Sequence, residues 1–271
     1  MTRNVFIRTA LLLGILIFVG CNLQERMLYF PSNDVPNDKT IASRHMQFWP
    51  SGRDGYRGFV STGPARASGT IVVFHGNAGT AADRDFYIEA LAPLGFRVLL
   101  AEYPGYGARE GKPGEAAFVK DAQETLRLLS AQYRGPIYLL GESLGCGVAA
   151  SVAKDAPIRI DGIILITPWD TLRSVAKHHY PWLPVSLFLH DKYDSAANLK
   201  GYTGPVAVVG AERDEVIPLR HAQVLYDALG TRKKMWVVKA AGHNDWPMVV
   251  GPQWWKEIAD FVRANAAAES P

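Results

Sequence analysis

Six short runs of β-branched and aliphatic residues constrain this chain more than any other feature. They are TIVVF (70–74), FRVLLAEY (96–103), IYLLGE (137–142), GIILIT (162–167), PVAVVG (205–210) and MWVVKA (235–240). Runs with so little polar alternation are typical of strands that are buried on both faces, as in parallel sheets covered by helices. The runs therefore predict the centre of an α/β domain.

Amphipathic segments alternate with these runs. Apolar residues recur at helical spacing in 80–93, 114–133, 144–154, 218–229 and 252–266. This alternation predicts a mostly parallel, doubly wound sheet. Two alternating runs, RHMQFWP (44–50) and YRGFVS (56–61), predict an antiparallel hairpin at its N-terminal edge. The 271 residues suffice for one such domain, which we expect over 44–271.

The run at 137–142 leads into GESLG, which places Ser143 between Gly141 and Gly145. A sharp strand-to-helix turn that presents a serine hydroxyl needs small residues at both flanks, because larger side chains clash across the bend. Ligands of doubly wound sheets bind at the carboxyl ends of the strands, where Ser143 is expected. Ser143 is therefore the candidate nucleophile.

A serine nucleophile needs a base, and histidine is the usual one. His243, in AAGHNDW, follows the last expected strand in a glycine-containing loop and is the candidate base. The remaining histidines have less favourable positions in the expected topology: His45 in the edge strand, His75 in the turn after 70–74, His221 on a helix, and His178, His179 and His190 in a long connection.

The base in turn needs an acid that orients it. Asp214 follows the run at 205–210 and gives the chain order Ser, Asp, His. Asp170, in TPWD after the preceding strand, is the alternative.

Attack on a carbonyl also requires N–H donors for the oxyanion. FHGNAG follows the run at 70–74, and its glycines allow backbone amides to approach a ligand. We assign one donor to the Asn77 N–H and the other to the Leu144 N–H, next to the nucleophile. His75 is expected to fix the turn.

The connection from 168 to 204 is much longer than the roughly 2–6 residues usual between a strand and a helix. It contains HHYPWLPVSLFLHD, whose prolines prevent one regular helix. We expect a small cap over the strand ends. The alternative is a pair of surface helices whose aromatic side chains pack on the body of the domain.

The N-terminus has the layout of an export signal. Residues 1–20 have a basic start and an apolar stretch from Ala10 to Val19, which is shorter than the roughly 20 residues of a membrane span. FVGC also resembles a bacterial lipobox with Cys21 as the lipidated residue. A lipoprotein, an uncleaved signal anchor and a secreted form remain open, and all three export the protein. Residues 21–43 are expected to be a linker.

Composition excludes several other classes. The formal net charge is +3, and no block of basic and aromatic residues suggests a nucleic-acid partner. Cys21 and Cys146 are the only cysteines, so the chain has no disulfide framework and no cysteine zinc site. No metal-ligand spacing occurs elsewhere. Cys146 is expected to be a small buried residue beneath the turn.

Several motifs occur in one family's order: HGNAG, EYPGYG, GESLG, ERDEVIP and AGHND. Together they resemble α/β-hydrolase serine enzymes, in the membrane-associated branch of protein depalmitoylases and acylglycerol lipases. The resemblance extends from RMLYFPS (26–32) to AGHNDW and includes the cap. One departure is Gly210-Ala211, where the family more often has His-Gly. Tyr103 and Tyr106 of EYPGYG are expected either to shape the pocket or to be structural.

The resemblance implies an α/β-hydrolase fold and an esterase, thioesterase or lipase. We expect an exported, membrane-tethered serine hydrolase that cleaves a small or lipid-like acyl ester or thioester through an acyl-enzyme on Ser143, without a cofactor. Two alternatives remain: a peptidase on the same fold, and a non-catalytic binding or scaffold protein. The intact set of Ser143, Asp214 and His243 argues against the scaffold.

Overall fold

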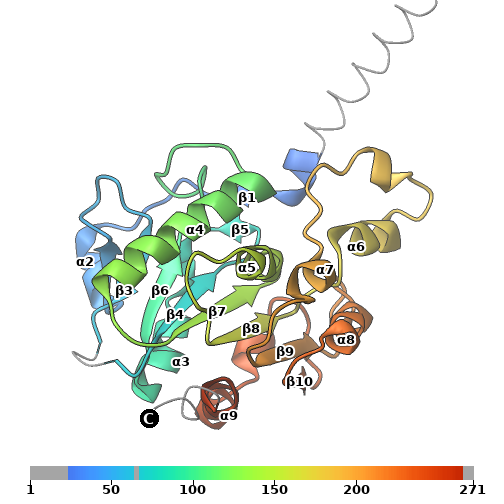
Figure 1. The fold of residues 1–271 in the computed structure, drawn as a ribbon. Coiled ribbons are helices and arrows are strands. Elements are labelled where there is room, and N and C mark those ends of the chain that lie inside the picture. Colours follow the sequence, from blue (N-terminus) through green and yellow to red (C-terminus); the bar gives the residue numbers. More distant parts are fainter. Residues whose placement is uncertain (1–23, 64–66, 265–271) are drawn as a thin grey trace, which may run out of the picture.

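The computed structural model, which describes residues 24–63 and 67–264, is built on an eight-stranded sheet with the order β10-β9-β8-β7-β4-β6-β3-β2 (Figure 1). Its strands are β2 (Met46–Trp49), β3 (Gly58–Ser61), β4 (Thr70–Phe74), β6 (Arg97–Ala101), β7 (Ile137–Glu142), β8 (Gly162–Ile166), β9 (Val206–Ala211) and β10 (Lys233–Val238). Strands β4 and β6 to β10 are parallel, and β3 joins β6 and β2 in antiparallel fashion. The predicted fold class, including the antiparallel N-terminal edge, is confirmed.

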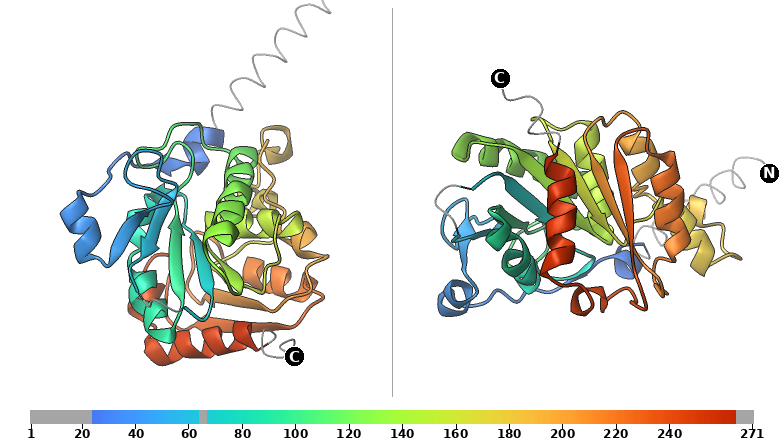
Figure 2. Two further views of the ribbon diagram at one scale, coloured as in Figure 1. Left: turned by 60° about the vertical axis from the view of Figure 1, so that its left-hand side comes forward. Right: turned by 90° about the horizontal axis from the view of Figure 1, so that it is seen from below.

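Helices cover both faces of this sheet, because its strands are apolar on both sides. One face packs against α4 (Glu115–Gln132), α5 (Leu144–Lys154) and α8 (Leu219–Ala228). The other packs against α3 (Phe86–Leu91) and α9 (Pro252–Arg263), and Figure 2 shows α9 lying along that face. Each face thus has its own buried apolar cluster.

The segment 80–93, predicted as one helix, is divided into three pieces. Short 3₁₀ turns, η1 (Ala81–Arg84) and η2 (Ala92–Leu94), flank α3. Pro93 lacks the N–H that a continued helix needs, and Gly95 then takes a left-handed conformation with φ 87°. The chain therefore turns sharply into β6.

The connection over 168–204 contains α6 (Leu172–His179), the 3₁₀ turn η3 (Val185–Leu187) and α7 (Ser195–Leu199). A β-bridge between Thr171 and Asp194 closes its base. The main chain between α6 and α7 projects beside the helical residues 24–28 (Figure 1). We call residues 168–204 the cap.

The N-terminal segment, which we expected to be a linker over 21–43, takes part in the fold from residue 24 onward. After the helical residues 24–28, β1 (Phe30–Pro31) pairs in parallel with β5 (Ala78–Gly79), and α2 (Asp38–Ser43) precedes β2. The expected export signal at 1–20 and Cys21 lie outside the described residues. Within 24–63 and 67–264, no helix is long and apolar enough to cross a bilayer.

The turn from β7 to α5 brings backbone against backbone. A Cβ atom on Gly145 would lie 1.9 Å from the Phe74 carbonyl oxygen, and one on Gly141 would lie 2.5 Å from the Gly145 carbonyl oxygen. Between them, Ser143 has a φ of 52°, a conformation that costs a non-glycine residue free energy. The glycines therefore allow the packing that holds Ser143 in this strained position.

Replacing Gly145 by alanine tests this packing. We expect Gly145→Ala to lower the free energy of unfolding by about 3 kcal/mol, because the methyl group has no room beside the end of β4. Gly251→Ala is the matched control, since its Cβ would have no atom within 4 Å. Urea unfolding of both variants measures the effect, and equal midpoints would contradict it.

Candidate active site

Ser143, His243 and Asp214 meet at the carboxyl edge of the sheet. The Ser143 hydroxyl oxygen lies 3.0 Å from Nε2 of His243, and Nδ1 of His243 lies 2.8 Å from Oδ2 of Asp214. These residues come from the end of β7, from the loop after β10 and from the loop after β9. The structure thus brings together the three residues that the sequence singled out.

The Asp214 carboxylate is held by its own loop. Its Oδ1 accepts hydrogen bonds from the N–H groups of Val216 (2.9 Å) and Ile217 (2.7 Å), which leaves Oδ2 for His243. The aspartate is buried, so these bonds compensate for much of its lost hydration. The carboxylate is fixed before any ligand binds.

Asp170, the alternative acid, has other partners. Its Oδ1 lies 2.8 Å from Nδ1 of His221 and accepts a hydrogen bond from the Ser174 hydroxyl at 2.6 Å. These contacts join the start of the cap to α8. Asp214, and not Asp170, is therefore the carboxylate beside His243.

The two expected oxyanion donors border the same cavity as Ser143. Leu144 is the first residue of α5, so its N–H has no acceptor within the helix. The Asn77 carbonyl accepts hydrogen bonds from the Phe30 N–H (2.9 Å) and the Tyr106 hydroxyl (2.8 Å). The Asn77 carbonyl oxygen is therefore already occupied by two donors, and these bonds hold its loop in place.

The tyrosines of EYPGYG are buried supports for this loop. Tyr103 donates its hydroxyl hydrogen to the His75 carbonyl at 2.8 Å, as Tyr106 does to Asn77. Burial raises the pKa of both phenols, so both remain protonated donors at neutral pH. The buried His75 ring lies 3.1 Å from Glu102 and 2.8 Å from the Gly76 carbonyl, so it belongs to the same support.

An ion pair next to the nucleophile was not expected from the sequence. The Glu142 carboxylate accepts hydrogen bonds from Nε of Arg84 (3.1 Å) and from the Tyr87 hydroxyl (2.8 Å). Burial by itself favours neutral Arg84, but Glu142 outweighs it and the pKa of Arg84 is raised. The negative charge of Glu142, the residue before Ser143, is thus balanced by Arg84. In the sequence, the position of Glu142 inside GESLG was the one feature that could have indicated this ion pair.

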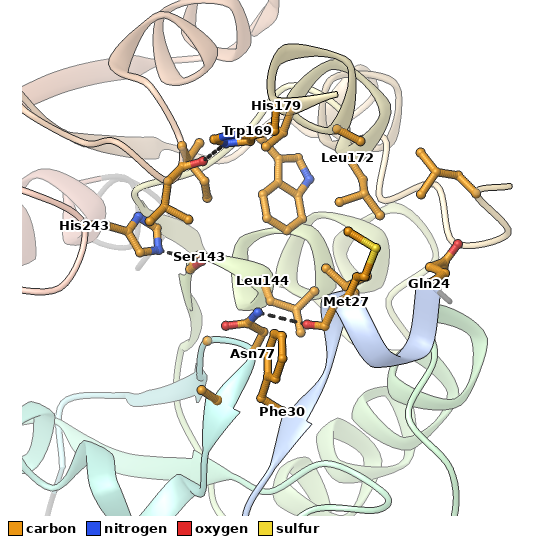
Figure 3. A pocket seen from close by; sticks show the side chains of 18 of the residues that line it. Gln24, Met27, Phe30, Asn77, Ser143, Leu144, Trp169, Leu172, His179 and His243 are labelled. Carbon is orange, nitrogen blue, oxygen red and sulfur yellow. Dashed lines mark hydrogen bonds between the residues drawn. The ribbon is translucent and has the colours of Figure 1, made fainter. Parts of the chain in front are cut away.

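The cavity beside Ser143 has a volume of about 600 Å³ and a mainly apolar wall. Figure 3 shows His243 and Ser143 at one end and Gln24 at the other. Trp169 and Leu172 of the cap line one side. The opposite side includes Met27, Leu28 and Phe30, which precede the sheet. The cap therefore lines a pocket and does not simply pack on the domain.

Cys146 is fully buried, and its thiol lies 3.0 Å from the Gly141 carbonyl oxygen. Burial raises its pKa well above the ordinary value, which keeps the thiol protonated and unreactive. Among residues 24–63 and 67–264, no cluster of His, Cys, Asp and Glu could hold a metal ion.

Comparisons with known proteins place this geometry among hydrolytic enzymes. Residues 65–193 match the family described as serine aminopeptidase, S33. The chain is 32% identical to an uncharacterized protein of Mycobacterium tuberculosis over 93% of this chain and 92% of that protein. It is 29% identical to lysophosphatidylserine lipase of Danio rerio over 72% of this chain and 58% of the lipase.

Among solved structures, an esterase of Pyrococcus furiosus has the same fold. It superposes with a TM-score of 0.68 at 16% sequence identity and covers 88% of this chain and 97% of the esterase. The sequence-based resemblance to α/β-hydrolase enzymes is confirmed by these matches.

Removing the Tyr106 hydroxyl tests the support of the Asn77 loop. We expect Tyr106→Phe to lower the rate of ester hydrolysis about tenfold, because a small displacement of the Asn77 N–H weakens its bond to a developing oxyanion. Tyr202→Phe is the control, since its hydroxyl donates to the distant Ile160 carbonyl. Equal kcat values for the two variants would contradict this assignment.

Proposed function

This chain belongs to the α/β-hydrolase family, and from that premise we propose that it is a serine hydrolase that cleaves a carboxylic ester or thioester with an apolar acyl group. The observation that carries the proposal is the continuous hydrogen-bonded series Ser143, His243, Asp214 at one end of an apolar pocket. Esterase and lipase names among its relatives and structural neighbours support the same class.

The proposed reaction proceeds through an acyl-enzyme. The Ser143 hydroxyl donates its proton to Nε2 of His243 as its oxygen attacks the carbonyl carbon, and the carbonyl π electrons move to the oxygen. Asp214 accepts a hydrogen bond from the Nδ1–H group of His243 and stabilises the imidazolium. As the tetrahedral intermediate collapses, the bond to the leaving oxygen or sulfur breaks and His243 gives its proton to that atom, which leaves as an alcohol or thiol. In the second half, His243 takes a proton from water, whose oxygen attacks the acyl carbon. The bond to Ser143 then breaks, the acid is released, and His243 returns the proton to the Ser143 oxygen.

The Asn77 and Leu144 N–H groups are proposed to hold the oxyanion of both tetrahedral intermediates. Each such donor contributes about 3 kcal/mol to lowering the barrier in serine hydrolases. The Leu144 N–H also lies at the N-terminus of α5, where the helix dipole favours negative charge. Because Arg84 neutralises Glu142, the Glu142 carboxylate does not repel the oxyanion.

The shape and polarity of the pocket support an acyl chain as the group it binds. Its volume lies within the range of about 300–1,000 Å³ for small-molecule sites. From Ser143, the wall continues with Trp169, Leu172 and Met27 toward Gln24 (Figure 3). Burial of an extended hydrocarbon chain in this space lowers the free energy, whereas burial of a charged group raises it because the group loses its hydration.

Aminopeptidase activity is the second candidate, because the matched family carries that description. An aminopeptidase needs an acidic group that binds the substrate's α-ammonium. Glu142 is engaged by Arg84 and Tyr87, which leaves Glu215 as the other acidic residue in the described wall of the pocket. Faster cleavage of amino-acid anilides than of fatty-acyl esters would favour this candidate.

The N-terminal sequence supports a site of action outside the cytoplasm. We assign residues 1–20 to export and Cys21 to lipid attachment, with a signal anchor as the alternative for membrane tethering. Intact-mass analysis of protein from the membrane fraction tests this assignment, since a mature N-terminus without a lipid mass would exclude a lipoprotein.

The assignment of the acid can be tested with two asparagine variants. We expect Asp214→Asn to lower kcat for a short-chain ester about 10³-fold or more, because an amide cannot stabilise the imidazolium. Asp170→Asn removes a partly buried carboxylate beside His221 and is expected to change kcat by no more than about threefold. Circular dichroism confirms that both variants are folded. A larger loss in Asp170→Asn would transfer the role to that residue.

A further inference from the structure

The part of the cap that connects α6 to α7 exposes two large apolar side chains. Trp182 is 78% exposed and Leu187 is 72% exposed. Their neighbours Leu183 and Val185 line the pocket instead, and Tyr180 lines it while it remains 37% exposed. The loop thus directs some apolar side chains inward and presents others to solvent, where packing within the described domain gives them no role. Exposed apolar side chains gathered on one face indicate an interaction surface.

The exposed apolar surface continues across the pocket to the N-terminal segment. Met27 and Phe30 line the pocket and remain 44% and 51% exposed. The Gln24 side chain accepts a hydrogen bond from the His190 N–H and donates one to Asp191, so this segment and the cap lie side by side. Figure 3 shows the two elements facing each other across the cavity. We call the five side chains of Met27, Phe30, Tyr180, Trp182 and Leu187 the apolar rim.

The charge around the rim indicates what it binds. On the cap side of the rim, residues 172–190 contain Arg173 and Lys177 and no aspartate or glutamate, while the N-terminal side has one acid and one base, Glu25 and Arg26. Lys177 and the neighbouring His178 and His179 are exposed. Basic residues beside exposed aromatic and aliphatic side chains are typical of surfaces that bind anionic membranes.

The position of the N-terminal segment supports the same partner. The described chain starts at Gln24, five positions after the apolar stretch that ends at Val19. Five residues span at most about 18 Å. If that stretch enters a membrane, Gln24 has to lie within this reach of the bilayer surface, and Gln24 is hydrogen-bonded to the cap at His190 and Asp191.

We infer that the apolar rim inserts into the surface of an anionic lipid bilayer, with the pocket opening toward the lipid. The second part of this inference rests on the proposed function, because it has the acyl chain pass from the bilayer along Met27 and Leu172 to Ser143. Lys177 contacts the anionic headgroups beside the rim.

Fluorescence quenching tests the insertion without any need for activity. The full chain, with Cys21→Ser and a fluorophore on Leu187→Cys, is reconstituted in vesicles of phosphatidylcholine and phosphatidylglycerol. We expect a quencher attached to lipid chains to quench this label at least about threefold more than a label on Glu257→Cys, which lies on α9 at the opposite face. Equal quenching of the two labels would overturn the inference.

Kinetics test the delivery of substrate. The full chain with Trp182→Ser and Leu187→Ser is expected to hydrolyse a long-chain ester in these vesicles about tenfold more slowly, and a water-soluble acetate ester within about twofold of the wild type. Val224→Ser with Met248→Ser is the matched control, since both side chains are exposed and lie outside the rim. Equal losses in the two double variants would overturn the inference.

Two further outcomes separate the alternatives. A wild-type chain that hydrolyses neither ester contradicts the proposed function, while the quenching experiment still decides the insertion. A wild-type dimer in light scattering that becomes a monomer in the rim variant, with no lipid quenching, would make a second copy of the chain the occupant and overturn the membrane assignment.

Discussion

The contact between the first turn of α5 and the end of β4 determines the geometry of the rest of the site. Gly145 lies so close to the Phe74 carbonyl that no side chain fits between them. This approach makes the turn after β7 sharp and holds Ser143 at a φ of 52°. A relaxed turn would place the hydroxyl elsewhere along α5, beyond the reach of His243. The strain at Ser143 is compensated by the packing of the buried helix α5 against β7 and β4.

The remaining groups converge because parallel strands end at one edge of the sheet. Loops after β9 and β10 carry Asp214 and His243, and the loop after β4 carries Asn77. Each group is fixed by hydrogen bonds that do not involve a ligand, including the amides that bind Asp214 and the phenol that binds the Asn77 carbonyl. Such preorganisation is what allows electrostatic stabilisation to lower a barrier. The cap adds a mainly apolar wall to the cavity beside Ser143.

The sheet and the three converging residues could be predicted from the sequence because their signals are local. Apolar runs mark the buried strands, and a glycine on either side of Ser143 marks the turn. The contribution of residues 24–31 could not be predicted in this way. Their role depends on β1 pairing with β5, a contact between positions nearly fifty residues apart, and two-residue strands have no periodicity to detect. The Arg84–Glu142 pair was missed for the same reason, since its partners are 58 positions apart. The break at Pro93 could have been read from the sequence.

Intact-mass analysis after treatment with a fluorophosphonate is the measurement that shows whether Ser143 is an activated nucleophile, because this probe bonds covalently to activated serines. We expect one adduct on the full chain, located at Ser143 and absent from Ser143→Ala and His243→Ala. Folded protein that remains unmodified, or an adduct that persists in Ser143→Ala, would contradict it.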